Sequence, residues 1–273
     1  MLETPRRVSI STWALHPALG TVTPGRPGEP EARLMNPHQG TLDLLDVPAE
    51  LAKRGIFTME LCHFHVPDRS DAYLEKLKAA LSGAGVELWS LLIDDGDLTD
   101  PEHGDRDRQW VLGWIDTASK LGATCVRIIA GKQPPTEENL EKAAAQLKLL
   151  VMEAYVRGIR VLTENWYPTL STPEAVGKLM YAMDGSVGLN FDFGNWNGED
   201  KYQKLARIIR YAEGSHAKCE FKAGEPDAED YIKTLEITKD GGYSGPYSIV
   251  HGEPNDLWGS IEAQKALIQP YLA

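Results

Sequence analysis

Short apolar runs alternate along the chain with stretches whose apolar residues recur at helical spacing. The runs begin near positions 8, 57, 87, 124, 159, 187, 216 and 247, and their aliphatic and β-branched content is typical of buried strands. Between positions 137 and 157, Leu140, Ala144, Leu147, Val151 and Ala154 recur every three or four residues, as on one face of a helix. The pattern predicts strands at 8–13, 57–62, 87–93, 124–130, 159–165, 187–192, 216–221 and 247–250, and helices at 48–55, 70–84, 108–121, 137–157, 173–183, 199–212, 227–239 and 258–271.

Strict alternation of eight strands and eight helices predicts an α/β fold, a (β/α)8 TIM barrel that forms a single domain over residues 1–273. An open doubly wound sheet is the alternative, and it is disfavoured because no glycine-rich phosphate turn follows the first strand. Residues 15–40 carry five prolines and four glycines with little periodicity. A segment of this length is either a lid over an active site or a disordered insertion.

Composition narrows the possible partners. The 273 residues carry a net charge of −12, so nucleic acid is not an expected partner, because phosphate contacts need a basic surface. No window is long and apolar enough to span a membrane, and the amino terminus lacks the apolar run of a signal peptide. The three cysteines are widely spaced, which indicates reduced, buried thiols in a cytoplasmic protein.

Three consecutive predicted strands carry side chains that bind metals. Glu164 ends the strand at 159–165, Asp192 ends the next, and His216 lies in the strand after that. Active sites of such barrels lie at the carboxyl ends of the strands. Two carboxylates and an imidazole suit a divalent ion such as Mn²⁺, Mg²⁺, Co²⁺ or Zn²⁺. We therefore expect these three residues to form a metal site; ordinary polar strand ends are the alternative.

Other side chains near the strand ends are candidates for binding substrate. Trp13 and Trp166 offer flat apolar faces that suit the C–H faces of sugars, although packing at the rim of the barrel would explain them equally well. Lys218 follows His216 by two residues and therefore points the same way, where it can stabilise an enolate or a sugar oxygen. Arg127 is a similar candidate. His65 is a further one, with His16, His63 and His251 as weaker alternatives.

Several stretches resemble the xylose isomerase-like TIM-barrel superfamily, in its sugar phosphate isomerase/epimerase branch. They are Thr58 to Leu61, Val161 to Asn165, Asn190 to Asn195, His216 to Lys218, and Gly242 to Ile249. The resemblance implies a barrel enzyme that acts on carbohydrates with the help of a divalent metal. Of the four metal ligands of the family, three fall on Glu164, Asp192 and His216.

The chain departs from the family pattern at two positions. The fourth ligand of the family, a glutamate after a Ser-Ile pair, is replaced by Val250, which cannot bind a metal or move a proton. Glu253 lies three residues later and is a candidate to reach back to the site. Asn195 stands where the related endonuclease IV would need a histidine, so DNA repair is not expected, and we expect Asn195 to contact substrate instead.

The sequence therefore predicts an isomerase or epimerase that removes a proton next to the carbonyl of a keto or aldo sugar, or of a polyol derivative. Glu164 is the expected general base and Lys218 the expected assisting group. A lyase or dehydratase that uses the same proton abstraction is an alternative, as is a non-catalytic sugar-binding barrel that has lost its chemistry with the fourth ligand. The pattern does not identify the substrate, the metal or the oligomeric state.

Overall fold

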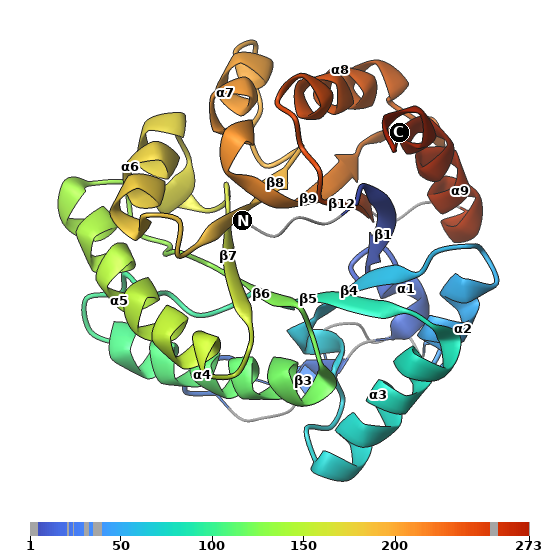
Figure 1. The fold of residues 1–273 in the computed structure, drawn as a ribbon, viewed down its shortest axis with the longest axis horizontal. Coiled ribbons are helices and arrows are strands. Elements are labelled where there is room, and N and C mark those ends of the chain that lie inside the picture. The colour runs from blue at the N-terminus through green and yellow to red at the C-terminus, as the bar shows by residue number, and fades with distance from the viewer. Residues whose placement is uncertain are drawn as a thin grey trace.

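The computed structural model describes residues 5–20, 22–23, 25–29, 33–34, 40–251 and 256–272. Eight parallel strands close into a barrel in the order β1-β12-β9-β8-β7-β6-β5-β4, and β4 pairs with β1 to complete the ring. Figure 1 shows the helices as an outer ring around these strands. The single-domain TIM barrel predicted from the alternation of elements is confirmed, and the open doubly wound sheet is excluded.

The barrel strands are β1 (Arg7–Ser11), β4 (Thr58–Cys62), β5 (Glu87–Ile93), β6 (Cys125–Ile128), β7 (Arg160–Glu164), β8 (Gly188–Asp192), β9 (Ala212–Cys219) and β12 (Pro246–His251). The outer helices are α2 (Val47–Ala52), α3 (Asp71–Ala84), α4 (Gly104–Leu121), α5 (Glu137–Tyr155), α6 (Pro173–Met183), α7 (Lys201–Ile208), α8 (Ala228–Asp240) and α9 (Leu257–Ile268). None of the helices in the described ranges is long and apolar enough to cross a membrane.

Short elements lie outside this pattern. The segment predicted to lack regular structure contains helix α1 (His16–Leu19) and a small antiparallel pair, β2 (Val22–Thr23) with β3 (Arg33–Leu34). A second antiparallel pair, β10 (Phe221–Lys222) with β11 (Glu225–Pro226), follows β9. The predicted strand at 216–221 instead begins at Ala212 and ends at Cys219, and helix α7 gives way to a 3₁₀ turn after Ile208.

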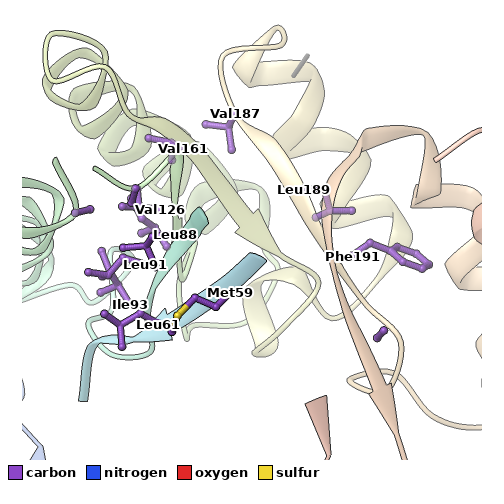
Figure 2. Close-up of a cluster of buried hydrophobic side chains, with 14 of the residues drawn as sticks. Met59, Leu61, Leu88, Leu91, Ile93, Val126, Val161, Val187, Leu189 and Phe191 are labelled. Atoms are coloured by element: carbon purple, nitrogen blue, oxygen red, sulfur yellow. The ribbon is translucent and has the colours of Figure 1, made fainter. Parts of the chain in front are cut away.

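Successive side chains along each strand point alternately outward, into the hydrophobic core between the strands and the helices, and inward, into the barrel. On β4, Met59 and Leu61 point outward and are buried against the helices, whereas Glu60 points into the barrel. Figure 2 shows the outward-facing layer, in which Met59 and Leu61 belong to the same cluster as Val161, Leu189 and other strand residues. Burial of these side chains holds the strands in register and fixes the direction of every inward-facing side chain.

Ion pairs lie at the end of the barrel where the strands begin. Arg7 on β1 contacts Glu87 on β5 at 2.6 Å, and Arg160 on β7 contacts Glu213 on β9 at 2.7 Å. The two ends of the described chain also meet there: Arg6 donates hydrogen bonds to the carbonyl oxygens of Tyr243 and Tyr271. Because these contacts fill the end of the barrel where the strands begin, a binding site is expected at the opposite end, where the strands finish.

Candidate active site at the mouth of the barrel

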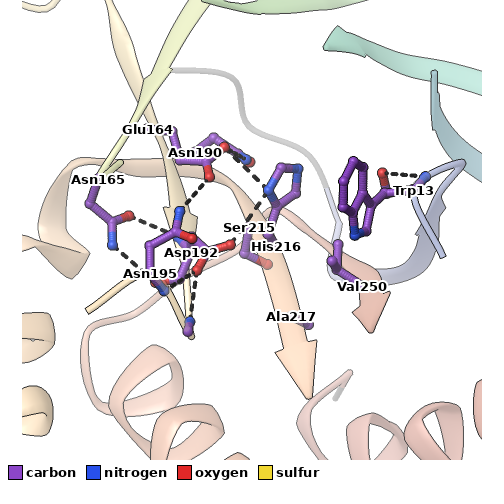
Figure 3. A network of polar contacts seen from close by, with 12 residues as sticks. Trp13, Glu164, Asn165, Asn190, Asp192, Asn195, Ser215, His216, Ala217 and Val250 are labelled. Carbon is purple, nitrogen blue, oxygen red and sulfur yellow. Dashed lines mark hydrogen bonds and ion pairs between the residues drawn. The ribbon is translucent and has the colours of Figure 1, made fainter. Parts of the chain in front are cut away.

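Glu164, Asp192 and His216 converge where β7, β8 and β9 end. One ligand atom from each lies within 4.8 Å of the others. The Nδ1 atom of His216 is 3.2 Å from Oε2 of Glu164 and 3.6 Å from Oδ2 of Asp192, and all three side chains are buried. Asp192 and His216 are direct partners in the sheet register, which aligns their side chains on the inner face. Figure 3 shows the three groups facing one another.

Asparagine side chains hold the carboxylate of Glu164, and backbone N–H groups hold that of Asp192. The amide of Asn195 donates to Oε1 of Glu164 at 2.7 Å, and the amide of Asn190 donates to Oε2 at 3.2 Å. Asn165 bonds both the N–H and the carbonyl of Asp192, which fixes the end of β8. Oδ1 of Asp192 accepts the backbone N–H groups of residues 194 and 195. Oδ2 of Asp192 therefore remains directed toward His216 (Figure 3).

Glu60 supports His216 from the interior of the barrel. Its Oε2 atom lies 3.0 Å from Nε2 of His216, and its carboxylate is fully buried. The contact is an ion pair by distance and lacks hydrogen-bond geometry, and a carboxylate beside the outer nitrogen of a metal-binding histidine favours the orientation that leaves the other nitrogen free to bind. Nδ1 of His216 then faces Glu164 and Asp192 as a lone-pair donor. This donor set fits a divalent ion, which Glu164, Asp192 and His216 could hold.

Arg127 is the fourth charged group beside this cluster. Its Nε atom lies 3.1 Å from Oε2 of Glu164, and its Nη2 atom pairs with Asp94. Burial would lower the pKa of Arg127, but Asp94 and Glu164 outweigh that effect and raise it. Burial would likewise raise the pKa of Glu164, yet the charges of His216 and Arg127 hold it at about 2. Glu164 is therefore ionised at neutral pH, as a ligand or base must be.

The pKa of His216 is raised well above its usual value. Burial acts in the opposite direction, but the carboxylates of Glu164 and Glu60 outweigh it. With no metal bound, the imidazole is thus a cation among carboxylates. A divalent ion at the same place would supply that positive charge instead.

A cavity of about 310 Å³ opens above these groups, a size suited to a small-molecule ligand. Of the candidates that the sequence indicated, Trp13, Trp166, Arg127, Asn195 and Lys218 line it together with the three ligand residues. Trp166 lies with its ring 5.2 Å from the guanidinium of Arg127. The aromatic rings and charged groups of these strand ends thus share one space.

Two sequence candidates lie elsewhere. His65 is not among the residues that line the cavity; its ring contacts Thr12 at 2.8 Å and His16 at 3.1 Å, so it braces the end of β1. Glu253 falls outside the described residues, and its expected contact with the site remains a prediction. His63 takes the place at the cavity wall that we expected for His65, and its Nδ1 accepts the backbone N–H of Asp94.

Val250 lines the cavity where a fourth ligand was expected from the resemblance. It is buried, and its direct neighbour in the sheet register is Lys218. Among the described residues Lys218 has no hydrogen-bond or ion-pair partner. The next residue, His251, points out of the barrel, where its ring packs 5.7 Å from that of Phe221. The β12 side of the cavity is therefore apolar, with one ammonium group beside it.

Sequence reasoning missed Tyr167 and the contact made by the long loop. Tyr167 lines the cavity with φ of +56° and ψ of 168°, a combination that costs a non-glycine residue on the order of 1–3 kcal/mol. Gly25 and Arg26 of the loop after β1 also line the cavity, and Arg26 forms an ion pair of 2.8 Å with Asp95. Part of the segment expected as a lid thus lies at the cavity.

Comparison with known proteins agrees with this architecture. The family model described as xylose isomerase-like TIM barrel matches residues 48–263. The chain belongs to the xylose isomerase-like TIM barrel family. No protein of curated function matches the sequence significantly.

Several solved structures share the fold along nearly the whole chain. L-ribulose 3-epimerase has a TM-score of 0.72 at 16% identity, covering 98% of this chain and 94% of that one. D-allulose 3-epimerase from Methylomonas sp. has a TM-score of 0.70 at 12% identity, with 98% of each chain covered. A xylose isomerase-like TIM barrel protein from Mycobacterium smegmatis, in complex with magnesium, has a TM-score of 0.69 at 17% identity and full coverage of both chains.

Proposed function

We propose that this protein is an isomerase- or epimerase-type enzyme that removes a proton next to the carbonyl of a small keto or aldo sugar or polyol derivative, with a divalent ion at Glu164, Asp192 and His216. The convergence of these three buried groups on one cavity is the observation that carries the proposal. The likeness of the fold to sugar epimerases supports the substrate class.

Each residue has a role that its contacts support. Glu164 takes the proton from carbon, because it is ionised and lies at the cavity floor. Asn195, Asn190 and Arg127 hold its carboxylate in one orientation, which favours catalysis by positioning. A bound divalent ion would stabilise negative charge on the carbonyl oxygen. Lys218 donates a hydrogen bond to a substrate oxygen, since its ammonium has no partner among the described residues.

The apolar β12 side of the cavity bears on the type of reaction. A two-base epimerisation needs proton donors on opposite faces of the substrate, and Val250 offers none. A single base at Glu164 suits reactions in which the proton leaves and returns on one face, as in aldose–ketose isomerisation. It also suits β-elimination, in which the proton does not return. A lyase is therefore the second candidate, and Val250 is the observation that favours it.

Exchange of solvent deuterium into substrate tests the proposal whatever the product. Ketoses, aldoses and inososes would be incubated in D₂O with the protein and Mn²⁺, Mg²⁺, Co²⁺ or Zn²⁺, and followed by proton NMR. We expect loss of a single C–H signal next to the carbonyl of one compound, and loss of that exchange in Glu164→Gln. The exposed Glu102→Gln variant is the matched control. Exchange that persists in Glu164→Gln would overturn the role of this residue, and no exchange in any compound would favour a binding protein.

A further inference from the structure

Exposed apolar side chains gather on one side of the barrel, away from the cavity. Eight large apolar residues are exposed in the described part of the chain, and five of them belong to α5, the residue that follows it, and α6. They are Leu149, Met152, Tyr155, Val156 and Tyr181. Tyr155 is 82% exposed and Tyr181 88% exposed. Figure 1 shows α6 beside α5 in the outer ring, so the five residues belong to two neighbouring helices on one side of the barrel.

Helix α5 carries two apolar faces. Its inner face, with Leu140, Ala144, Leu147 and Leu150 among others, is buried against the barrel. Its outer face carries Ala145, Leu149, Met152 and Val156, all exposed and spaced by four, three and four residues. A solvated helix face is normally polar, and this spacing is the repeat by which helices pack against one another in coiled coils. The outer face therefore has the form of a helix-packing surface.

We propose that this face binds the same face of a second copy of the chain, with the two α5 helices antiparallel about a two-fold axis. The stripe is self-complementary in this arrangement: Leu149 lies level with Met152 of the second copy, and Ala145 with Val156. Two equal layers form on either side of the axis, as an isologous interface requires.

The residues that flank the stripe fit this arrangement. In an antiparallel pair, each flank of one helix faces the same flank of the other. Lys148 and Tyr155 lie on one flank, so each ammonium approaches a tyrosine ring of the second copy, a favourable contact. Gln146 and Glu153 lie on the other flank, where Gln146 donates a hydrogen bond to Asp105 and Glu153 pairs with Arg157 within the same chain, so both side chains already have a polar partner. No like charges are opposed at either flank.

The area of the patch is sufficient for a stable dimer. Aromatic side chains carry ~150–250 Å² each, so the exposed parts of Tyr155 and Tyr181 alone present on the order of 300 Å² on each subunit, and Leu149, Met152 and Val156 add to this area. Each partner of a standard interface buries ~800 Å². The apolar patch thus provides a large part of that area, and the flanking polar residues provide a rim.

Sedimentation velocity from 1 to 100 µM tests the proposal on the intact chain. We expect the wild type to sediment with twice the 30.2 kDa of one chain, and Met152→Glu to sediment as a monomer, because the two new carboxylates at residue 152 of the two copies would then face one apolar seam. Ile232→Glu on α8, which replaces another exposed apolar residue far from α5, is the matched control and should remain a dimer. Circular dichroism and the thermal midpoint establish that both variants are folded.

The double variant Leu149→Lys, Met152→Glu tests the register, since each new lysine would face a new glutamate of the second copy. We expect the dimer to return, with a dissociation constant at least tenfold lower than that of Met152→Glu alone. A monomeric wild type at 100 µM, or a dimer that withstands Met152→Glu, would overturn the proposed interface. Failure of the double variant to recover would overturn the antiparallel arrangement.

Discussion

Replacing Val250 by glutamate tests how far the metal site depends on its apolar side. The side chain of Val250 lines the cavity, so a carboxylate at this position points toward the space beside Glu164 and His216. One charged ligand or supporting group commonly changes metal affinity by ~10–100-fold, and a tenfold change corresponds to about 1.4 kcal/mol. We therefore expect Val250→Glu to bind Mn²⁺ more tightly by about 1.4–2.7 kcal/mol.

Lys218 reduces this gain in a way that can be measured. It is the register neighbour of Val250, so its ammonium would compete with the metal for the new carboxylate. The Val250→Glu, Lys218→Met double variant should bind Mn²⁺ more tightly than Val250→Glu alone. Without metal, the double variant should be the less stable of the two, because a buried carboxylate without a partner costs about 1–3 kcal/mol. At this chain length that cost lowers the thermal midpoint by roughly 2–10 °C.

Calorimetric titration of Mn²⁺ and thermal unfolding with and without the ion would measure both effects. Val250→Gln is the matched control, because it adds a side chain of similar shape without the charge. Saturating metal at 100 times its dissociation constant should restore about 2.7 kcal/mol. Equal affinities for Val250→Glu and Val250→Gln would refute the reasoning. If Glu253→Gln instead removes the metal from the wild type, Glu253 already supplies the fourth ligand.

Three further predictions concern single contacts. Glu60→Gln should weaken Mn²⁺ binding by ~10–100-fold through loss of the support to His216, measured by the same titration; an unchanged affinity would contradict that role. Tyr167→Gly and Tyr167→Ala both remove the ring, but only glycine adopts φ of +56° without strain, so the glycine variant should be more stable by about 1 kcal/mol in urea unfolding. Saturating sugar should increase hydrogen-exchange protection at residues 25–29, and Arg26→Ala should diminish that increase; equal protection with and without sugar would indicate a static loop.

Strand and helix positions could be predicted well wherever the apolar pattern was strong. The exception at β9 has a physical reason: its first residues, Ala212 to Ser215, are small or polar and do not read as a strand. Glu213 is nevertheless buried there because Arg160 pairs with it. That pairing joins β7 to β9 across an intervening strand, and no local pattern reports it.

The candidate ligands could be predicted because each ends or lies in a strand that local periodicity identifies. The contacts that support them could not. Glu60 on β4 reaches His216 on β9, and Arg127 on β6 reaches Glu164 on β7. Both contacts depend on how the strands are staggered around the closed barrel. Strand alternation also could not tell which of His63 and His65 faces the cavity, because a 3₁₀ turn sets the directions of their side chains. His65 was therefore favoured over His63 as a substrate-binding candidate.

The hydrogen bonds from Arg6 to Tyr243 and Tyr271 place the two ends of the described chain side by side, at the end of the barrel remote from the cavity. The order in which the elements follow one another along the polypeptide can therefore change without changing the arrangement of side chains around the cavity. A circularly permuted chain, joined by a short linker and reopened in the turn at Gly185, should retain every strand end that faces the cavity. Such a chain would carry β8 and β9 at its start, so the candidate ligands Asp192 and His216 would be synthesised first and Glu164 last.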